Sequence, residues 1–186
     1  MIDNLIEGVI RLQSHLSKAG IASVVIGGLA VVVWGEPRLT RDVDLKVQLQ
    51  RDQSSHLLET LEPDYKLLSD DPRQTLQRTG MLFIENAAGL RLDLLLADTP
   101  FDDRAIDRGI GVEIHPSQAI TVCTPEDLIL YKMISTRPRD REDVRGIVRR
   151  QRDNLDDAYL LNWLEQFELA LDDSTLIAEY KNLRNI

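Results

Sequence analysis

The sequence contains few of the residues on which several kinds of site depend. Its 186 residues include one cysteine, Cys123, so an internal disulfide is excluded and a reducing compartment suits the chain. Cys123 ends an apolar run and has no activating base near it in sequence, so we expect a small core residue rather than a nucleophile. The three histidines, His15, His56 and His115, do not have the spacing of a zinc site.

Long apolar runs and positive charge are also scarce. The longest apolar run extends over 21–35, which is shorter than the roughly 20 residues of a membrane-spanning helix, and a glycine pair interrupts it. We therefore expect no membrane span and, because no secretory signal is visible, a cytoplasmic protein. Acidic side chains outnumber basic ones by 31 to 22, which gives a net charge of -9. Such a surface repels nucleic acid, so a polynucleotide partner would need a local basic patch.

The periodicity of the apolar residues predicts an α+β fold. Residues 1–122 mix helical and strand-like periods, whereas 123–186 are helical in pattern, and we expect a domain boundary between them. The first part is expected to form a mixed sheet of about four to five strands flanked by helices, followed by the helical C-terminal region. The expected helices cover 3–19, 29–35, 52–61, 101–107, 156–170 and 173–183, and the expected strands cover 22–26, 43–48, 81–85, 90–96 and 110–115.

Local signals set some of the boundaries between these elements. The sequence TPED, beginning at Thr124, is a helix-capping signature with proline at the first helical position. We expect Pro138 to end that helix and Asp140 to cap the next one. The segment 64–80 has no clear period and is expected to hold a short strand and an irregular loop.

Three aspartates on two predicted strands are candidates for a metal site. Asp42 and Asp44 are two residues apart and therefore share one face of a strand whose apolar residues point the other way. Asp93 lies among leucines on a later strand, with Arg91 on the same face. If the strands are neighbours, the three carboxylates converge, and one or two Mg²⁺ ions would neutralise them. The alternative for Asp42 and Asp44 is that they are solvated surface residues.

A glycine pair lies between an apolar strand and an apolar helix. Gly27 and Gly28 would let the backbone approach a ligand closely, and the N-terminus of the following helix offers N–H groups to a phosphate. The alternative is a tight turn without a ligand. The glycine pair indicates a ligand-binding turn only in combination with the aspartates downstream.

Together these motifs resemble the DNA polymerase β-type nucleotidyltransferase superfamily. Its first motif pairs a GG or GS turn with an aspartate-x-aspartate on the next strand, as in VIGGLAVVVWGEPRLTRDVDL over 25–45, and its third carboxylate corresponds to Asp93. The spacing between GG and DVD is similar to that of the AbiEii-type toxin-like branch. That branch also has a helical lysine followed by an aspartate pair, which corresponds here to Lys132, Asp140 and Asp143.

The resemblance implies a Mg²⁺-dependent enzyme that transfers a nucleotide from NTP to an acceptor. It makes Asp42, Asp44 and Asp93 both the catalytic residues and the metal ligands, with Asp93 also a candidate general base. Positioning and charge neutralisation do most of the work in such a reaction, so carboxylates, a glycine turn and one or two cations suffice.

The resemblance also implies nucleotide binding by Gly27, Gly28, Arg38 and Lys132. Lys132 could instead be a helix lysine whose charged end reaches solvent. Asp140 and Asp143 either belong to the active site or cap a helix. Arg41, like Arg38, precedes the candidate metal strand and either contacts phosphate or neutralises nearby aspartates.

The segment 137–152 holds seven arginines. At helical spacing Arg141, Arg145, Arg149 and Arg152 form a stripe that could bind the backbone of an RNA. The alternative is a solvated face paired with the neighbouring acids Glu142, Asp143 and Asp153. No aromatic side chain alternates with the arginines, so base stacking on this helix is not expected.

Three functions compete at this stage. The first is a toxin-like nucleotidyltransferase that modifies tRNA or a protein and is held in check by an antitoxin protein. The second is a nucleotidyltransferase acting on a small molecule such as an aminoglycoside, for which an acidic cleft would suit a cationic acceptor. The third is a non-catalytic module that binds a nucleotide or a partner, against which the complete set of carboxylates argues.

Overall fold

The computed structural model describes residues 2–40, 42–62, 64–116 and 118–185; Arg41 lies outside this part. The chain forms two compact units. Unit 1 comprises residues 1–29 and 39–123, and unit 2 comprises residues 30–38 and 124–186. Helix α2 (Gly27–Trp34) begins in the first and continues in the second.

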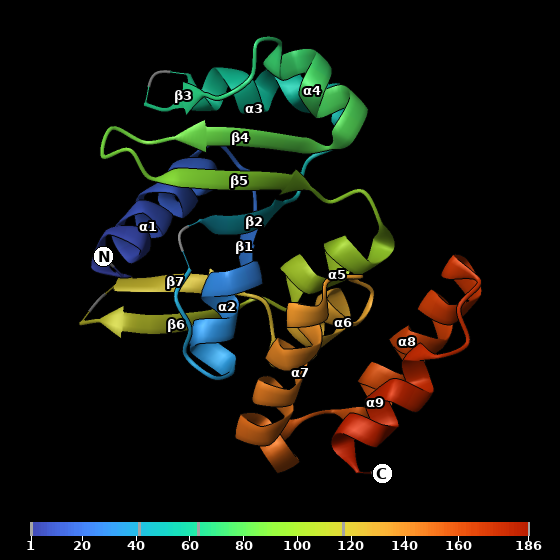
Figure 1. The fold of residues 1–186 in the computed structure, drawn as a ribbon. Helices are drawn as coiled ribbons and strands as arrows, with labels where there is room; N and C mark the ends of the chain where they lie inside the picture. Colours follow the sequence, from blue (N-terminus) through green and yellow to red (C-terminus); the bar gives the residue numbers. More distant parts are fainter. Residues whose placement is uncertain (1, 41, 63, 117, 186) are drawn as a thin grey trace. The chain divides into compact units, whose positions relative to one another are not determined.

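Unit 1 is built on a mixed sheet, which confirms the α+β prediction. In the described part of the chain the sheet has seven strands, more than the four to five expected. They are β1 (Ser23–Ile26), β2 (Val43–Val47), β3 (Lys66–Leu67), β4 (Met81–Glu85), β5 (Arg91–Leu96), β6 (Ile110–His115) and β7 (Gln118–Val122). Their order across the sheet is β3-β4-β5-β2-β1-β7-β6 (Figure 1).

The pairing of the central strands determines which side chains become neighbours. Strand β2 is antiparallel to β1 and parallel to β5, and β5 is antiparallel to β4. The expected alternation on β2 is confirmed, since Val43, Leu45 and Val47 are fully buried. The core face of β5 carries Leu92 and Leu94, which are buried to the same extent. The polar residues between these apolar positions therefore share the other face of the sheet.

The helices of unit 1 fall largely where the sequence predicts them. Besides the first residues of α2, they are α1 (Ile2–Lys18), α3 (Ser54–Leu61), α4 (Pro72–Thr79) and α5 (Pro100–Asp107), with a 3-10 turn η1 (Arg51–Gln53) before α3. Helix α1 buries Val9, Leu12 and Leu16 completely, as its 3.6-residue period predicts. It is followed by Gly20 in the left-handed region, with φ 76°.

The prediction of a short strand and an irregular loop over 64–80 is confirmed for the strand, β3, and wrong for the loop, because α4 occupies half of the segment. Asp71 caps this helix by accepting a hydrogen bond from the Gln74 N–H at 2.9 Å, and Pro72 is at its start. Gly80 ends it in the left-handed conformation, with φ 67°.

Unit 2 is helical, with α6 (Pro125–Met133), α7 (Pro138–Gln151), the 3-10 turn η2 (Arg152–Asn154), α8 (Asp157–Leu171) and α9 (Leu176–Arg184). Thr124 caps α6 as predicted, accepting from the Asp127 N–H at 3.1 Å. The expected role of Pro138 is wrong: α6 ends at Met133, and Pro138 is instead the first residue of α7. Asp140 does not cap α7, because it lies inside the helix, whose N-cap is Arg137.

Segment 30–38 is held to α7 by backbone and side-chain contacts. Arg150 Nη1 donates to the Gly35 carbonyl at 2.7 Å, and Gln151 Nε2 donates to the Trp34 carbonyl at 2.8 Å. A Cβ on Gly146 would lie 3.0 Å from the Glu36 side chain, so the absence of a side chain there permits this close approach. These contacts account for the placement of 30–38 in the helical unit.

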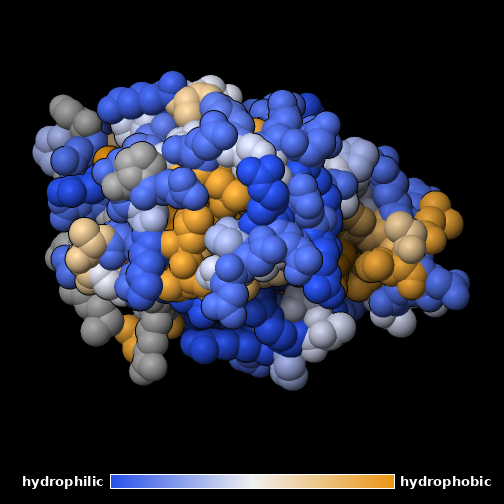
Figure 2. All heavy atoms as spheres, turned by 90° about the horizontal axis from the view of Figure 1, so that it is seen from above, coloured by the Kyte–Doolittle hydropathy of each residue, from blue (hydrophilic) through white to orange (hydrophobic). Residues whose placement is uncertain are grey.

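One face of the molecule is mostly hydrophilic (Figure 2). Figure 2 shows polar residues over most of one face, with apolar residues gathered in a few patches. Among the helices in the described part of the chain, none is long and apolar enough to cross a membrane.

Candidate functional site

The pairing of β2 with β5 brings two of the three predicted carboxylates side by side. Asp44 and Asp93 are register partners in this parallel pair, so they project from the same face of strands about 4.8 Å apart. Asp93 is 7% exposed, whereas Asp44 is half-buried. Asp42 precedes β2 by one residue, and Thr40 Oγ1 lies 3.1 Å from its carbonyl oxygen and 3.3 Å from its carboxylate. Asp44 and Asp93 thus share the polar face of the sheet, and Asp42 lies in the chain directly before β2.

Gly27 lies directly beneath the carboxylate of Asp44. Ile26 of β1 is the register partner of Asp44, so the turn into α2 passes beside this side chain. A Cβ built on Gly27 would lie 1.9 Å from Asp44 Oδ2, and the φ of 63° is one that side chains rarely adopt. A residue without a side chain is therefore required here, and Gly28 follows in the first turn of α2. The backbone of this turn therefore lies next to the Asp44 carboxylate.

Arg91 is a site residue to which the sequence analysis assigned no role. Its Nε donates to Asp93 Oδ1 at 2.7 Å and its Nη2 donates to Asp93 Oδ2 at 3.0 Å, so both carboxylate oxygens are engaged. These hydrogen bonds, followed by the charges of Asp93, Asp42 and Asp44, raise the pKa of the Arg91 guanidinium. The signal in the sequence was an arginine two residues before Asp93 on the same strand face.

The donor set at this position suits a hard divalent cation. Within residues 2–40, 42–62, 64–116 and 118–185, no group of three or more His, Cys, Asp or Glu side chains is already arranged around a metal position. The oxygens of Asp93 face Arg91 instead. Carboxylate oxygens, which Asp42, Asp44 and Asp93 supply, are nevertheless the ligands that Mg²⁺ prefers. Because Gly27 has no side chain, the Asp44 carboxylate can lie close to the backbone.

The remaining predicted site residues form a separate cluster in unit 2. Lys132 Nζ lies 2.5 Å from Asp140 Oδ1 and 2.9 Å from Asp143 Oδ2. Arg38 binds Asp143 with two hydrogen bonds, from Nε at 2.9 Å and from Nη2 at 3.0 Å. Arg137 and Ser135 both donate to Asp140 Oδ2. Arg38, Lys132, Asp140 and Asp143 are therefore held together as one ion-pair network.

The network resolves two of the alternatives left open by the sequence. Lys132 does not reach solvent, because only 5% of its side chain is exposed. The helix-cap interpretation of Asp140 and Asp143 is wrong, since α7 begins at Pro138 without a side-chain cap and both residues lie inside it. Burial raises the pKa of Asp140, but hydrogen bonds from Lys132 and Ser135 and nearby positive charges outweigh burial, so its pKa is lowered.

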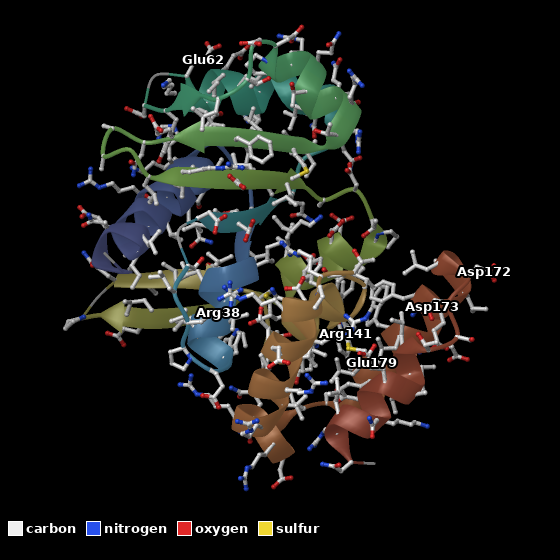
Figure 3. The ribbon with its side chains drawn as sticks, in the orientation of Figure 1. Arg38, Glu62, Arg141, Asp172, Asp173 and Glu179 are labelled. Atoms are coloured by element: carbon white, nitrogen blue, oxygen red, sulfur yellow. The ribbon has the colours of Figure 1, made fainter. Side chains whose placement is uncertain are left out.

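Most of the predicted arginine stripe is paired with acidic side chains. Arg141 Nε donates to Glu179 of α9 at 2.6 Å, which joins α7 to α9 (Figure 3). Arg145 pairs with Glu142 at 3.0 Å and Arg149 with Glu36 at 3.6 Å. Arg152 lies beyond the end of α7, in η2. Of the acids expected to pair with the stripe, Glu142 does so, whereas Asp143 pairs instead with Lys132 and Arg38.

A cleft of about 590 Å³ is found in unit 1, away from the carboxylates. It is lined by one stripe of α1, residues 64–65 and the turn 86–88, and none of Asp42, Asp44 and Asp93 is among its lining residues. Gly8 of α1 packs against Leu90, the half-buried residue that directly precedes β5. The cleft therefore does not extend the carboxylate site.

The fold is shared with a nucleotidyltransferase-like protein and with an antibiotic-resistance factor, both of low sequence identity. An antigenic nucleotidyltransferase-like protein from Paracoccidioides brasiliensis superposes with a TM-score of 0.56 at 16% identity, over 94% of this chain and 96% of its own. The solution structure of the antibiotic-resistance factor ANT(2'')-Ia gives a TM-score of 0.60 at 11% identity, over 92% of this chain and 97% of its own. At these identities the likeness concerns the fold.

Sequence comparison identifies the family. No curated protein matches the chain. The model of the family described as "Nucleotidyltransferase of unknown function (DUF6036)" matches residues 1–162, a span that contains Gly27, the three carboxylates and the lysine–aspartate network. The chain belongs to this family of nucleotidyltransferases.

Proposed function

We propose that the chain transfers a nucleotide from NTP to an acceptor with Asp42, Asp44 and Asp93 as ligands of one or two Mg²⁺ ions. The observation that carries this proposal is the register of β2 and β5, which sets Asp44 beside Asp93 at the Gly27 turn. A bound Mg²⁺ would neutralise charge on the carboxylates and on the triphosphate. In the reaction an acceptor atom forms a bond to the α-phosphorus, the bond to the bridging oxygen breaks and pyrophosphate leaves.

The chain's own residues would bind and orient the reactants. The backbone N–H groups at Gly27 and Gly28 would hold phosphate oxygens, because the first N–H groups of a helix have no partner within it. Asp93 would accept the proton of the attacking group once Arg91 releases one of its oxygens. Arg38 and Lys132 would contribute to nucleotide binding only by exchanging their bonds to Asp143 and Asp140.

The charge pairing of the arginine stripe bears on which acceptor the enzyme would use. A tRNA would need uncompensated positive charge, and three of the four arginines proposed to bind it, Arg141, Arg145 and Arg149, are paired with Glu179, Glu142 and Glu36. A protein acceptor does not need to overcome the repulsion between an acidic surface and a phosphate backbone. We therefore keep the toxin-like activity with an antitoxin partner, as in the AbiEii-type branch, as part of the proposal.

A small cationic molecule is the second candidate acceptor. The net charge of -9 and the cluster of three carboxylates favour a positively charged substrate. One solved neighbour, ANT(2'')-Ia, is known in complex with adenylyl-2''-tobramycin, and its fold superposes on this chain with a TM-score of 0.56 at 11% identity. We therefore include aminoglycosides among the acceptors to be tested.

The test is transfer of each labelled NTP to total tRNA, to total protein and to a panel of aminoglycosides, with and without Mg²⁺. We expect label on one acceptor class, lost without the metal and lost in both Asp44→Asn and Asp93→Asn. Asp52→Asn, which changes an exposed carboxylate in η1, is the matched control and should transfer normally. Transfer that persists in Asp44→Asn would refute the assignment of the site, and growth arrest on expression of the wild type alone would support the toxin-like activity.

A further inference from the structure

The two oxygens of Asp93 are occupied by a side chain of the protein itself. Arg91 makes two charge-assisted hydrogen bonds to this carboxylate, at 2.7 and 3.0 Å. A metal ion bound to Asp93 needs at least one of the same oxygen atoms. The side chain and the metal therefore compete for one ligand.

The Arg91 guanidinium packs on an aromatic ring, and about half of the Arg91 side chain is exposed to solvent. Its Cζ lies 4.6 Å from the centre of the Phe83 ring, and Phe83 is the register partner of Asp93 on β4. The Arg91 side chain is 52% exposed, whereas that of Asp93 is 10% exposed. When the pair separates, the guanidinium can stay in water over the ring, while the carboxylate stays at the site.

The charge of Arg91 also acts on the whole group of carboxylates. Asp42 and Asp44 contribute to its electrostatic environment together with Asp93. Asp44 and Asp93 lie side by side in register, and such close like charges repel one another unless a cation is present. In the absence of a metal, Arg91 supplies positive charge at this place.

We propose that Arg91 is an internal counter-cation of the carboxylate site, which holds Asp93 before metal arrives and must release it for the metal to bind. This inference rests on the proposed metal site. It makes Arg91 a residue that weakens metal binding rather than one that positions a ligand. The released guanidinium then lies beside the site, where it is available to an oxygen of the triphosphate.

The two roles predict opposite changes in metal affinity. A residue that only positioned Asp93 would lower the affinity when removed. A competing counter-cation raises it, and for Arg91→Gln we expect Mn²⁺ to bind about 3- to 10-fold more tightly than to the wild type. Arg91→Lys keeps the charge but loses the two-pronged geometry, so it should give an intermediate affinity.

The experiment is titration of the full chain with Mn²⁺ alone, followed by calorimetry and by the electron paramagnetic resonance of free Mn²⁺, at one ionic strength. Arg51→Gln is the matched control, because it removes an arginine that binds Asp98 in the same two-pronged way, with hydrogen bonds of 2.9 and 2.7 Å. It should leave Mn²⁺ affinity unchanged. Far-ultraviolet circular dichroism would verify that each variant is folded.

The outcomes distinguish a failure of the counter-cation proposal from a failure of the metal site. Tighter binding in Arg91→Gln but not in Arg51→Gln supports the counter-cation. Unchanged or weaker binding in Arg91→Gln, with binding abolished in Asp93→Asn, overturns it and leaves the metal site standing. Wild-type binding retained in Asp93→Asn, or no Mn²⁺ binding by the wild type and Arg91→Gln alike, overturns both.

Discussion

At the scale of single residues, the most constrained position is the glycine beneath Asp44. Gly27→Ala adds a Cβ that would lie 1.9 Å from Asp44 Oδ2, at a φ of 63°. We expect the free energy of unfolding to fall by about 1–2 kcal/mol from the backbone alone, and the displaced carboxylate to lower nucleotide transfer by about tenfold or more. Chemical denaturation and the transfer assay measure the two effects.

Gly20→Ala is the control for this prediction. Gly20 also has a positive φ, 76°, but a Cβ there would meet nothing within 4 Å. It should therefore lose a similar free energy of unfolding while keeping full transfer activity. Equal activities of the two variants would show that the contact between Gly27 and Asp44 has no role in the reaction.

The second residue-scale prediction concerns the lysine of the ion-pair network. Lys132→Met leaves Asp140 and Asp143 buried without their shared ammonium partner, and only 4–5% of these side chains is exposed. Breaking a buried pair in this way typically lowers the free energy of unfolding by about 3–5 kcal/mol. Arg145→Met, which breaks an exposed pair with Glu142, should lower it by less than about 1 kcal/mol.

Urea denaturation of both variants, together with NTP binding, separates a structural role of Lys132 from a role in substrate binding. The structural role requires the large loss of stability. A Lys132→Met protein that is as stable as the wild type but binds NTP weakly would assign the lysine to the nucleotide.

At the scale of elements, an ion pair joins the last two helices of unit 2. Asp157 at the start of α8 accepts from Arg184 Nε at 3.0 Å and Nη2 at 3.1 Å, and also from the Tyr180 hydroxyl of α9. Burial acts to raise the pKa of Asp157, but the bonds from Arg184 and Tyr180 outweigh it and lower the pKa below its ordinary value of 3.8. Burial, followed by the hydrogen bond to Asp157, raises the pKa of Tyr180.

The lowered pKa of Asp157 predicts how stability depends on pH. A carboxyl whose pKa is lower in the folded state stabilises that state above its unfolded pKa, and this contribution is lost as the pH falls through the folded pKa. We expect the free energy of unfolding to decrease below about pH 4, with a shallower decrease in Asp157→Asn. Denaturation at pH 2.5–7 measures the slopes, and Asp153→Asn, an exposed change in η2, should keep the wild-type slope.

The elements that the sequence predicts well are those with a strong local signal. The period of α1, the alternation of β2 and the Thr124 cap of α6 are all present in the structure. Helix α4 was missed because it buries only Leu76 and so lacks an apolar stripe, although Asp71 and Gly80 marked its ends. Strand β7 was missed although it is as long as β2 and forms a local antiparallel pair with β6.

The same distinction applies to the candidate site. The face on which Asp44 and Asp93 lie follows from a period of two residues, so it could be predicted. Their adjacency depends on the parallel pairing of β2 with β5, which no local signal specifies. The sequence also did not predict that Lys132 pairs with both Asp140 and Asp143, because the partners of a buried charge are determined by tertiary packing.

At the scale of the whole molecule, the helical unit is not a continuous stretch of chain. Segment 30–38 belongs to it but is bracketed in sequence by residues of unit 1. The segment contributes the buried side chain of Val31. Its Trp34 and Gly35 carbonyls accept hydrogen bonds from α7, and its Arg38 guanidinium binds Asp143. Unit 2 is therefore incomplete without a piece of chain almost 90 residues upstream of its remainder.

This organisation predicts that residues 124–186 do not fold alone. Without 30–38, Asp143 keeps Lys132 but loses the two hydrogen bonds from Arg38, and apolar surface of α7 is left uncovered. We expect the isolated fragment to show reduced helicity and no cooperative thermal transition by circular dichroism. Joining 30–38 to its N-terminus through a flexible glycine–serine linker should restore the transition, and the same fusion carrying Arg38→Gln should restore it less. A cooperative transition in the fragment alone, at the temperature of the full chain, would mean that unit 2 is stable without this segment and that 30–38 is held by it rather than required for it.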